Sequence, residues 1–231
     1  GYPEHGPLIE QSVADLGLDS RDVRVLRNSH AHSDHAGGLK HLQDVSGAEL
    51  WVSEGDAEVM AAGGAGDRAL GPARFAYYIG GLRFDAPRID HVFGDGEVIR
   101  VGPLELTARI TAGHTRGCTS WSFPVQHEER ELLAVSICSL TLFPFVSVVD
   151  RETYPGIRND FESSFRTLRD LPADLFLASH SSWFGLYRKR RAQAEAPDPA
   201  EPFIDPEGYA SFIDGEEADF LRQLADQGGD R

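Results

Sequence analysis

A cluster of histidines in the segment 28–35 constrains this chain more than any other stretch. His30, His32 and His35 are three of the nine histidines, and Asp34 lies among them. Neutral imidazole and carboxylate are the ligands that borderline divalent metals such as zinc take. Because His30 and His32 are two residues apart, their side chains point the same way in an extended segment. We therefore expect this segment to serve two adjacent metals rather than to be a polar loop with coincidental histidines.

The global properties of the sequence restrict its class and its partners. The chain has 231 residues, of which 41% are apolar and 26% charged, as in a globular domain with a sizeable core. Its net charge of −15 repels phosphate backbones and anionic lipids, so we expect neither nucleic acid nor a membrane as partner. No apolar run approaches the roughly 20 residues of a membrane-spanning helix.

Strand and helix patterns alternate along the chain, as in an α/β layered fold with chemistry at the carboxyl ends of strands. The expected strands are 22–27, 48–52, 89–92, 97–101, 104–110, one beginning near residue 119, 131–137 and 174–178. The expected helices are 8–17, 36–42, 54–60, 160–171, 186–194 and 207–226. The basic helix 186–194 is expected to present a solvated face. Residues 61–82 interrupt the pattern with a glycine-rich stretch followed by Phe75, Tyr77 and Tyr78, which allows either a lid or an ordinary surface loop.

Two further histidines each follow an expected strand. His114 comes after Gly113, and His180 closes the apolar strand 174–178. A lone histidine at a strand end is commonly structural, but a first metal with two histidines still needs a third protein ligand, which favours His114. Ser139 and Thr141 follow strand 131–137, and their hydroxyls project to one side of an extended segment.

Taken together, these motifs resemble the metallo-β-lactamase superfamily, and most closely the third subclass of class B β-lactamases. The residues that carry the resemblance are His30-Ala31-His32-Ser33-Asp34-His35, Gly113-His114-Thr115-Arg116-Gly117-Cys118, Cys138-Ser139-Leu140, Tyr154-Pro155-Gly156-Ile157 and Pro202-Phe203-Ile204-Asp205. The resemblance covers most of the chain. It implies an αββα sandwich of two mixed β-sheets flanked by helices, built as one domain over 1–231 with two similar halves, roughly 1–105 and 106–231.

The resemblance also implies a site and a reaction. The first of two zinc ions would be bound by His30, His32 and His114, and the second by Asp34, His35 and His180. A hydroxide shared by the two ions would open the β-lactam ring of an antibiotic, with Asp34 steering this nucleophile. Ser139 and Thr141 would orient the carboxylate of the small-molecule substrate or a zinc-bound water.

Two alternatives stay open. Other hydrolases of the same superfamily, such as thioesterases and lactonases, usually have a bridging aspartate near the position of Ser139, so the serine argues against them. A metal-binding scaffold without turnover is the second alternative, because the family's early strands are missing before Gly1. Without those strands we expect an exposed apolar sheet face and an exposed edge.

Cys118 and Cys138 stand at positions where relatives also carry cysteine. By the resemblance, they form either a disulfide or two buried thiols, and neither aligns with a zinc ligand. A disulfide would suit an exported, periplasmic protein, although the first residues of this chain do not form a signal peptide.

Overall fold

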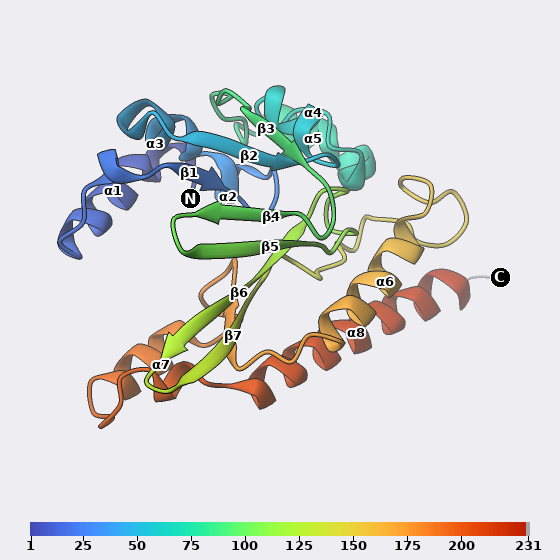
Figure 1. Ribbon diagram of the computed structural model, residues 1–231. Coiled ribbons are helices and arrows are strands. Elements are labelled where there is room, and N and C mark those ends of the chain that lie inside the picture. The colour runs from blue at the N-terminus through green and yellow to red at the C-terminus, as the bar shows by residue number, and fades with distance from the viewer. Residues whose placement is uncertain (230–231) are drawn as a thin grey trace.

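The computed structural model describes residues 1–229, apart from the side chains of residues 76–78 and 229. Two β-sheets pack against each other, and helices cover the outer face of each sheet (Figure 1). This order of helix, sheet, sheet and helix confirms the predicted α/β sandwich.

The first sheet is built from three parallel strands over the described residues. These are β1 (Val25–Arg27), β2 (Glu49–Ser53) and β3 (His91–Phe93), in the order β1-β2-β3. The helices between them are α2 (Ser33–Ala36), α3 (Leu39–Ser46), α4 (Ala57–Ala61) and α5 (Arg74–Ile79). Leu50 and Val52 on one face of β2 pack against Leu39 and Met60, and this buried cluster holds the helices on the sheet.

The second sheet has five strands in the order β4-β5-β6-β7-β8. They are β4 (Val98–Val101), β5 (Leu104–Ile110), β6 (Thr119–His127), β7 (Arg130–Ile137) and β8 (Leu175–Ala178). All neighbouring strands are antiparallel except the parallel pair β7 and β8. Helices α6 (Ile157–Arg169) and α8 (Pro206–Gly229) run side by side on its outer face (Figure 1), where Phe161 and Phe220 stack with ring centroids 5.4 Å apart.

The remaining elements connect these layers. They are helices α1 (Gly6–Asp15) and α7 (Leu186–Gln193), and 3-10 turns at Pro3–His5, Ser20–Asp22, Arg68–Ala73 and Glu201–Phe203. The predicted elements are therefore recovered, although the first strand is shorter than expected because residues 20–22 form a 3-10 turn. The predicted boundary between two halves near residue 105 falls within β5, and the division into halves stays a prediction.

The apolar face that the sequence predicts to be exposed is partly covered. Phe93 and Trp121 are buried between the two sheets, and Val25, Trp51 and Ile110 pack against them in partly buried positions. On the edge strand β3, Val92 is 54% exposed. The second sheet thus shields the inter-sheet face at these residues, while the edge at Val92 stays exposed.

The expectation of a fully solvated face on α7 is wrong for one residue. The side chain of Lys189 is 1% exposed and forms an ion pair with Asp205, with Nζ 2.8 Å from Oδ2. Its ammonium also lies 5.4 Å from the ring centroid of Phe176 and 5.9 Å from that of Phe184. A lysine can be buried along its aliphatic stem when a carboxylate and aromatic rings contact its ammonium group. A run of basic residues in the sequence does not show which of them has such partners.

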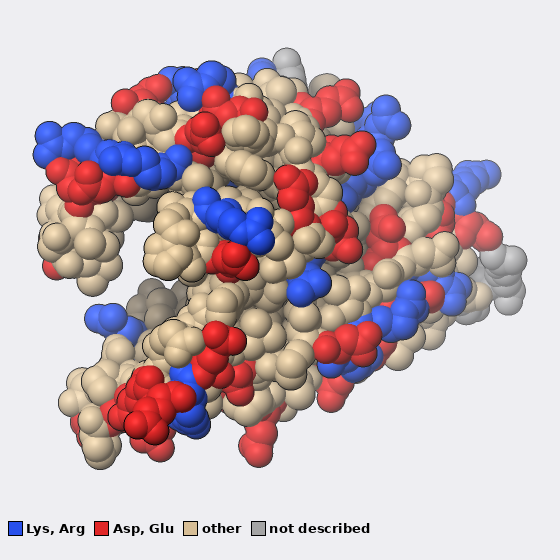
Figure 2. All heavy atoms as spheres, in the orientation of Figure 1, with Lys and Arg blue, Asp and Glu red and all other residues tan. Residues whose placement is uncertain are grey.

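The surface carries mixed charge. On the face shown in Figure 2, acidic and basic side chains are interspersed rather than gathered by sign. Among the described residues, no helix is both long and apolar enough to cross a membrane.

Four strands direct their carboxyl ends toward one region. β1 ends just before the histidine cluster, β5 just before Gly113 and His114, β7 before Ser139, and β8 before His180. Side chains far apart in the sequence are thereby brought together at one end of the sandwich.

Candidate metal centre

His30, His32 and His114 form a compact, buried triangle. The three ring centroids are 4.7, 4.8 and 4.9 Å apart, and one nitrogen of each ring lies within 4.8 Å of the others. His30 and His32 come from the loop between β1 and α2, and His114 comes from the loop between β5 and β6. The structure thus brings together the three side chains predicted to bind the first metal.

Each imidazole of this triangle is held by a contact at the nitrogen that faces away from the centre. The contacts are His30 Nδ1 to Ser29 Oγ at 3.2 Å, His32 Nε2 to Asp67 Oδ2 at 2.8 Å, and His114 Nδ1 to the Thr141 carbonyl at 2.9 Å. The Asp67 carboxylate and the Thr141 carbonyl can only accept, so they assign the protons of His32 and His114 to the outer nitrogens and leave lone pairs pointing inward, whereas the Ser29 hydroxyl can either donate or accept. Correspondingly, His30 Nε2 is buried and makes no hydrogen bond among the described residues.

Asp34, His35 and His180 form a second triangle beside the first. His35 Nε2 lies 3.1 Å from His180 Nε2 and 3.1 Å from Asp34 Oδ2, and His180 Nε2 lies 3.7 Å from the same oxygen. Two ligands on one tetrahedral ion with bonds of 2.0–2.1 Å are about 3.3 Å apart. The rings of His30 and His35, one from each triangle, have centroids only 4.1 Å apart, so the two triangles adjoin.

The electrostatics of the two triangles favour metal ligation. Burial, followed by the neighbouring imidazoles, lowers the pKa of His30 well below its usual value, and burial lowers the pKa of His114 to about 3. Burial raises the pKa of Asp34, but the hydrogen bond and charge of His35 outweigh it and bring the pKa to about 2. The imidazoles of His30 and His114 are therefore neutral and the carboxylate of Asp34 is charged, which are the forms that bind metal. The residues present fit two divalent ions, one in each triangle.

Gly113 allows helix α6 to pack closely against the loop that carries His114. Its φ of +138° lies in a region that favours glycine, and a Cβ atom there would meet the ring of Phe161 at 2.8 Å. The glycine thus lets helix α6 pack directly under the loop that carries His114.

A buried carboxylate, Asp56, joins the two loops of the first triangle. Its Oδ2 accepts hydrogen bonds from Ala31 N at 2.9 Å and Thr115 Oγ1 at 3.0 Å, and its Oδ1 accepts from Gly117 N at 2.9 Å. Burial, together with the charge of Asp67, raises the pKa of Asp56 to about 6. Asp56 therefore ties the backbone next to His30 and His32 to the backbone next to His114.

The two triangles line a pocket of about 340 Å³. Its other walls are Tyr2, Ser33, Leu70, Leu82, Ser139, Thr141, Phe143, Phe145 and Trp183. Phe143 stacks on Phe145 and lies 4.9 Å from the ring of His114, while Trp183 lies 4.5 Å from the ring of His180. The pocket thus combines a polar floor with an apolar wall, as binding sites for small organic molecules commonly do.

The segment 61–82 contributes to this pocket through Leu70 and Leu82. Phe75 is exposed, and the predicted contribution of Tyr77 and Tyr78 falls on side chains outside the described residues. That this segment closes over a ligand stays a prediction.

The chain matches the sequence profile of the family described as metallo-beta-lactamase superfamily over residues 1–127. The chain belongs to the metallo-beta-lactamase superfamily. Proteins of this superfamily bind metal ions, usually zinc, in agreement with the two triangles.

Solved structures extend the match to nearly the whole chain. The FEZ-1 metallo-beta-lactamase from Legionella gormanii superposes with a TM-score of 0.91 and 32% identity, covering 98% of this chain and 84% of that chain. BJP-1, a subclass B3 metallo-beta-lactamase of Bradyrhizobium japonicum, superposes with a TM-score of 0.86 and 30% identity, covering 99% and 83%. The resemblance inferred from the motifs is therefore confirmed at the level of the family and its fold.

One curated relative is named for a different activity. A hydroxyacylglutathione hydrolase from Jannaschia sp. (strain CCS1) is 26% identical over 111 residues, which cover 48% of this chain and 33% of the relative. The chain spans about half the length of the curated relatives it matches, or less. All comparisons are consistent with one coarser statement, that this chain is a hydrolase of the metallo-beta-lactamase superfamily.

All eight residues predicted for the site lie at this pocket, and their individual roles stay predictions. Sequence reasoning missed Asp56, Asp67 and Phe143. Asp56 lies directly before α4, yet its side chain makes no capping hydrogen bond with that helix. Its position just after the apolar strand β2 was the one signal that could have marked it.

Proposed function

We propose that this superfamily hydrolase opens the ring of β-lactam antibiotics, with two zinc ions in its two triangles. The single observation that carries the proposal is the convergence of His30, His32 and His114 beside Asp34, His35 and His180 at one pocket. Bound divalent ions supply a nucleophilic hydroxide near neutral pH and polarise a carbonyl oxygen.

The protein's own residues would orient the substrate and handle the proton. Asp34 lines the pocket with its Oδ2 3.1 Å from His35 Nε2 and 3.7 Å from His180 Nε2, and its carboxylate would steer the nucleophile and relay its proton. His30 is 1% exposed, whereas the side chain of His180 is 42% exposed, so a substrate would enter on the side of His180.

The polar and apolar walls of the pocket would bind different parts of the substrate. The hydroxyls of Ser139 and Thr141 would bind the substrate carboxylate, and Thr141 N already donates to Ser139 Oγ at 3.3 Å. Phe143, Phe145 and Trp183 would hold apolar substituents and keep water away from the reacting bond.

A thioesterase is the second candidate, because a hydroxyacylglutathione hydrolase is among the curated relatives. The serine at position 139 and the near-complete superposition with β-lactamases favour the lactam over the thioester.

The deciding experiment compares three substrate classes with one preparation. The zinc-loaded chain is assayed against a chromogenic cephalosporin, a glutathione thioester and a lactone, before and after removal of metal by a chelator. We expect β-lactam turnover that is lost with the metal and restored by zinc. His180→Ala should lose turnover, whereas the matched control His127→Ala should keep it, because His127 bonds Asp198 at the far end of β6. Faster thioester hydrolysis would favour the second candidate, and no hydrolysis with both metals bound would indicate a scaffold.

We also propose that the protein works in an oxidising compartment such as the periplasm, where the pairing of Cys118 with Cys138 would persist. Cell fractionation with thiol labelling tests this, and a cytoplasmic, fully reduced protein would contradict it.

A further inference from the structure

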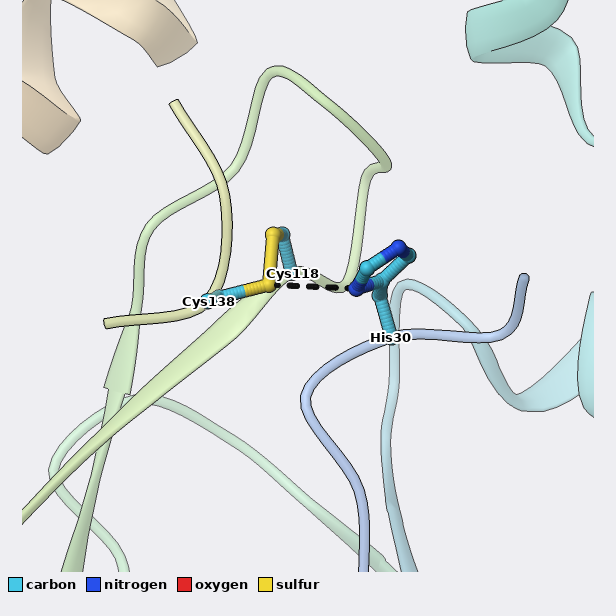
Figure 3. A group of neighbouring side chains, drawn as sticks. All are labelled: His30, Cys118 and Cys138. Carbon is cyan, nitrogen blue, oxygen red and sulfur yellow. Dashed lines mark hydrogen bonds between the residues drawn. A yellow bond between two sulfur atoms is a disulfide. The ribbon is translucent and has the colours of Figure 1, made fainter. Parts of the chain in front are cut away.

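Behind the first triangle lies another group of potential metal ligands, which shares one histidine with it. Figure 3 shows the sulfur of Cys138 directed at the ring of His30 and bonded to the sulfur of Cys118, with Cys138 Sγ 3.5 Å from His30 Nδ1. One ligand atom of each residue lies within 4.8 Å of the others, and all three residues are buried. In the structure the two cysteines are joined as a disulfide.

The spacing between sulfur and nitrogen suits a shared ion. Zinc binds thiolate sulfur at about 2.3 Å and imidazole nitrogen at about 2.0–2.1 Å, so a tetrahedral angle separates the two atoms by about 3.5 Å. This is the separation between Cys138 Sγ and His30 Nδ1. While the disulfide exists, neither sulfur can take a metal, because both are bonded to each other.

The backbone would keep the two cysteines together after reduction. Cys118 lies just before β6 and Cys138 just after β7, and the antiparallel pairing of Trp121 with Ser136 holds these strand ends side by side. Their Cα atoms are 5.9 Å apart. Rotation about the Cα–Cβ bonds is then enough to separate the sulfurs around an ion.

We propose that, once this disulfide is reduced, Cys118 Sγ, Cys138 Sγ and His30 Nδ1 form a thiolate-rich site for zinc or a similar thiophilic ion. In the reduction, a dithiol gives two electrons and two protons, the bond between the two cysteine sulfurs breaks, and the dithiol becomes a disulfide. The ion then displaces the two thiol protons as it binds.

Sharing His30 makes this site a competitor of the first triangle. Neutral imidazole carries one proton, which lies on Nδ1 when Nε2 faces the first triangle. Binding through Nδ1 moves that proton to Nε2 and removes one of the three ligands of the first triangle. The disulfide therefore protects the hydrolytic centre by keeping two strong ligands away from its histidine. This conclusion does not depend on which substrate the enzyme hydrolyses.

Cobalt is the probe that reports the proposed site directly, because thiolate ligands give Co²⁺ an intense charge-transfer absorption in the near ultraviolet. The full chain is stripped of metal, reduced with a dithiol, freed of the reductant without oxygen, and titrated with Co²⁺. The charge-transfer band is expected in the reduced chain and not in the oxidised chain. Cobalt binding by the reduced chain without this band would overturn the proposal.

Two controls separate the proposed site from a general effect of losing the crosslink. A Cys118→Ser/Cys138→Ser variant lacks both the disulfide and the thiolates, so it should bind Co²⁺ without the band. His30→Ala in the reduced chain should weaken the band sharply, and an undiminished band would refute the sharing of His30. If the double variant does not fold, the alkylation rate of the reduced wild-type thiols is measured with and without Zn²⁺. Slower alkylation with Zn²⁺ supports the site, and an unchanged rate counts against it.

Discussion

Replacing Asp67 by asparagine perturbs the first triangle without touching a predicted ligand. Asp67 Oδ2 accepts the proton of His32 Nε2 at 2.8 Å, and Asp67 Oδ1 accepts Ala69 N at 2.8 Å. Both side chains of the first pair are buried, with 6% and 4% exposure. The amide of the Asp67→Asn variant would offer one acceptor oxygen for two donors, so one of these two bonds must be lost.

The orientation of the new amide sets the magnitude. If the amide oxygen still accepts the hydrogen bond from Ala69 N, the NH₂ group faces His32 Nε2 and donates to it. The imidazole proton then moves to Nδ1 of His32, the nitrogen predicted to bind the metal. Loss of such a supporting hydrogen bond commonly weakens metal affinity by about 10- to 100-fold. This range corresponds to about 1.4–2.7 kcal/mol of binding free energy.

The assay is a competition for Zn²⁺ between the protein and a chromogenic chelator, for wild type and Asp67→Asn. We expect the affinity of one ion to fall by this factor while the ion in the second triangle is held as before. Asp44→Asn is the matched control, because it removes a carboxylate that pairs with Lys40 on the exposed surface of α3. If Asp67→Asn folds and binds both ions within about twofold of wild type, the assigned tautomer of His32 is wrong.

Three other parts of the structure give one prediction each. Phe143→Ala should raise KM for substrates with apolar side chains by about tenfold with little change in kcat, since pocket contacts contribute about 1–3 kcal/mol; steady-state kinetics tests this. Lys189→Ala should lower the free energy of unfolding by about 2–3 kcal/mol in urea, because Asp205 loses its buried partner, and an unchanged midpoint would contradict it. Asp56 has a pKa of about 6 in the folded protein, above its unfolded value of 3.8, so the folded state binds its proton more tightly than the unfolded state. The stability that this difference contributes is present below about pH 4 and is lost as the pH rises through about 6. Asp56→Asn should flatten this part of the pH profile of metal-free unfolding, and an equally steep profile would argue against the raised pKa.

The metal centre could be predicted from sequence because its signals are local. His30, His32, Asp34 and His35 stand within one short segment, and the sequence alone places them at a strand end. His114 and His180 could be added because each also follows an apolar strand, and parallel or neighbouring strands bring such ends together. The alternation of strands and helices was equally local, which explains why the layered fold was recovered.

The residues that support the centre were not predictable, because their partners lie far away in the sequence. Asp67 follows a glycine-rich stretch that offers no hint of a bond to a residue 35 positions earlier. Lys189 sits among arginines that are mostly solvated, and only the approach of Asp205 distinguishes it. In each case the deciding fact is a tertiary contact with a carboxylate, and a single sequence carries no local signature of it.

The three hydrogen bonds that Asp56 accepts hold both histidine-bearing loops in register through protein atoms alone. Ion capture should then require little chain ordering, and its heat-capacity change should be small. A preorganised set of ligands also selects among cations by their size and preferred coordination angles, because its loops cannot rearrange around a cation that fits poorly.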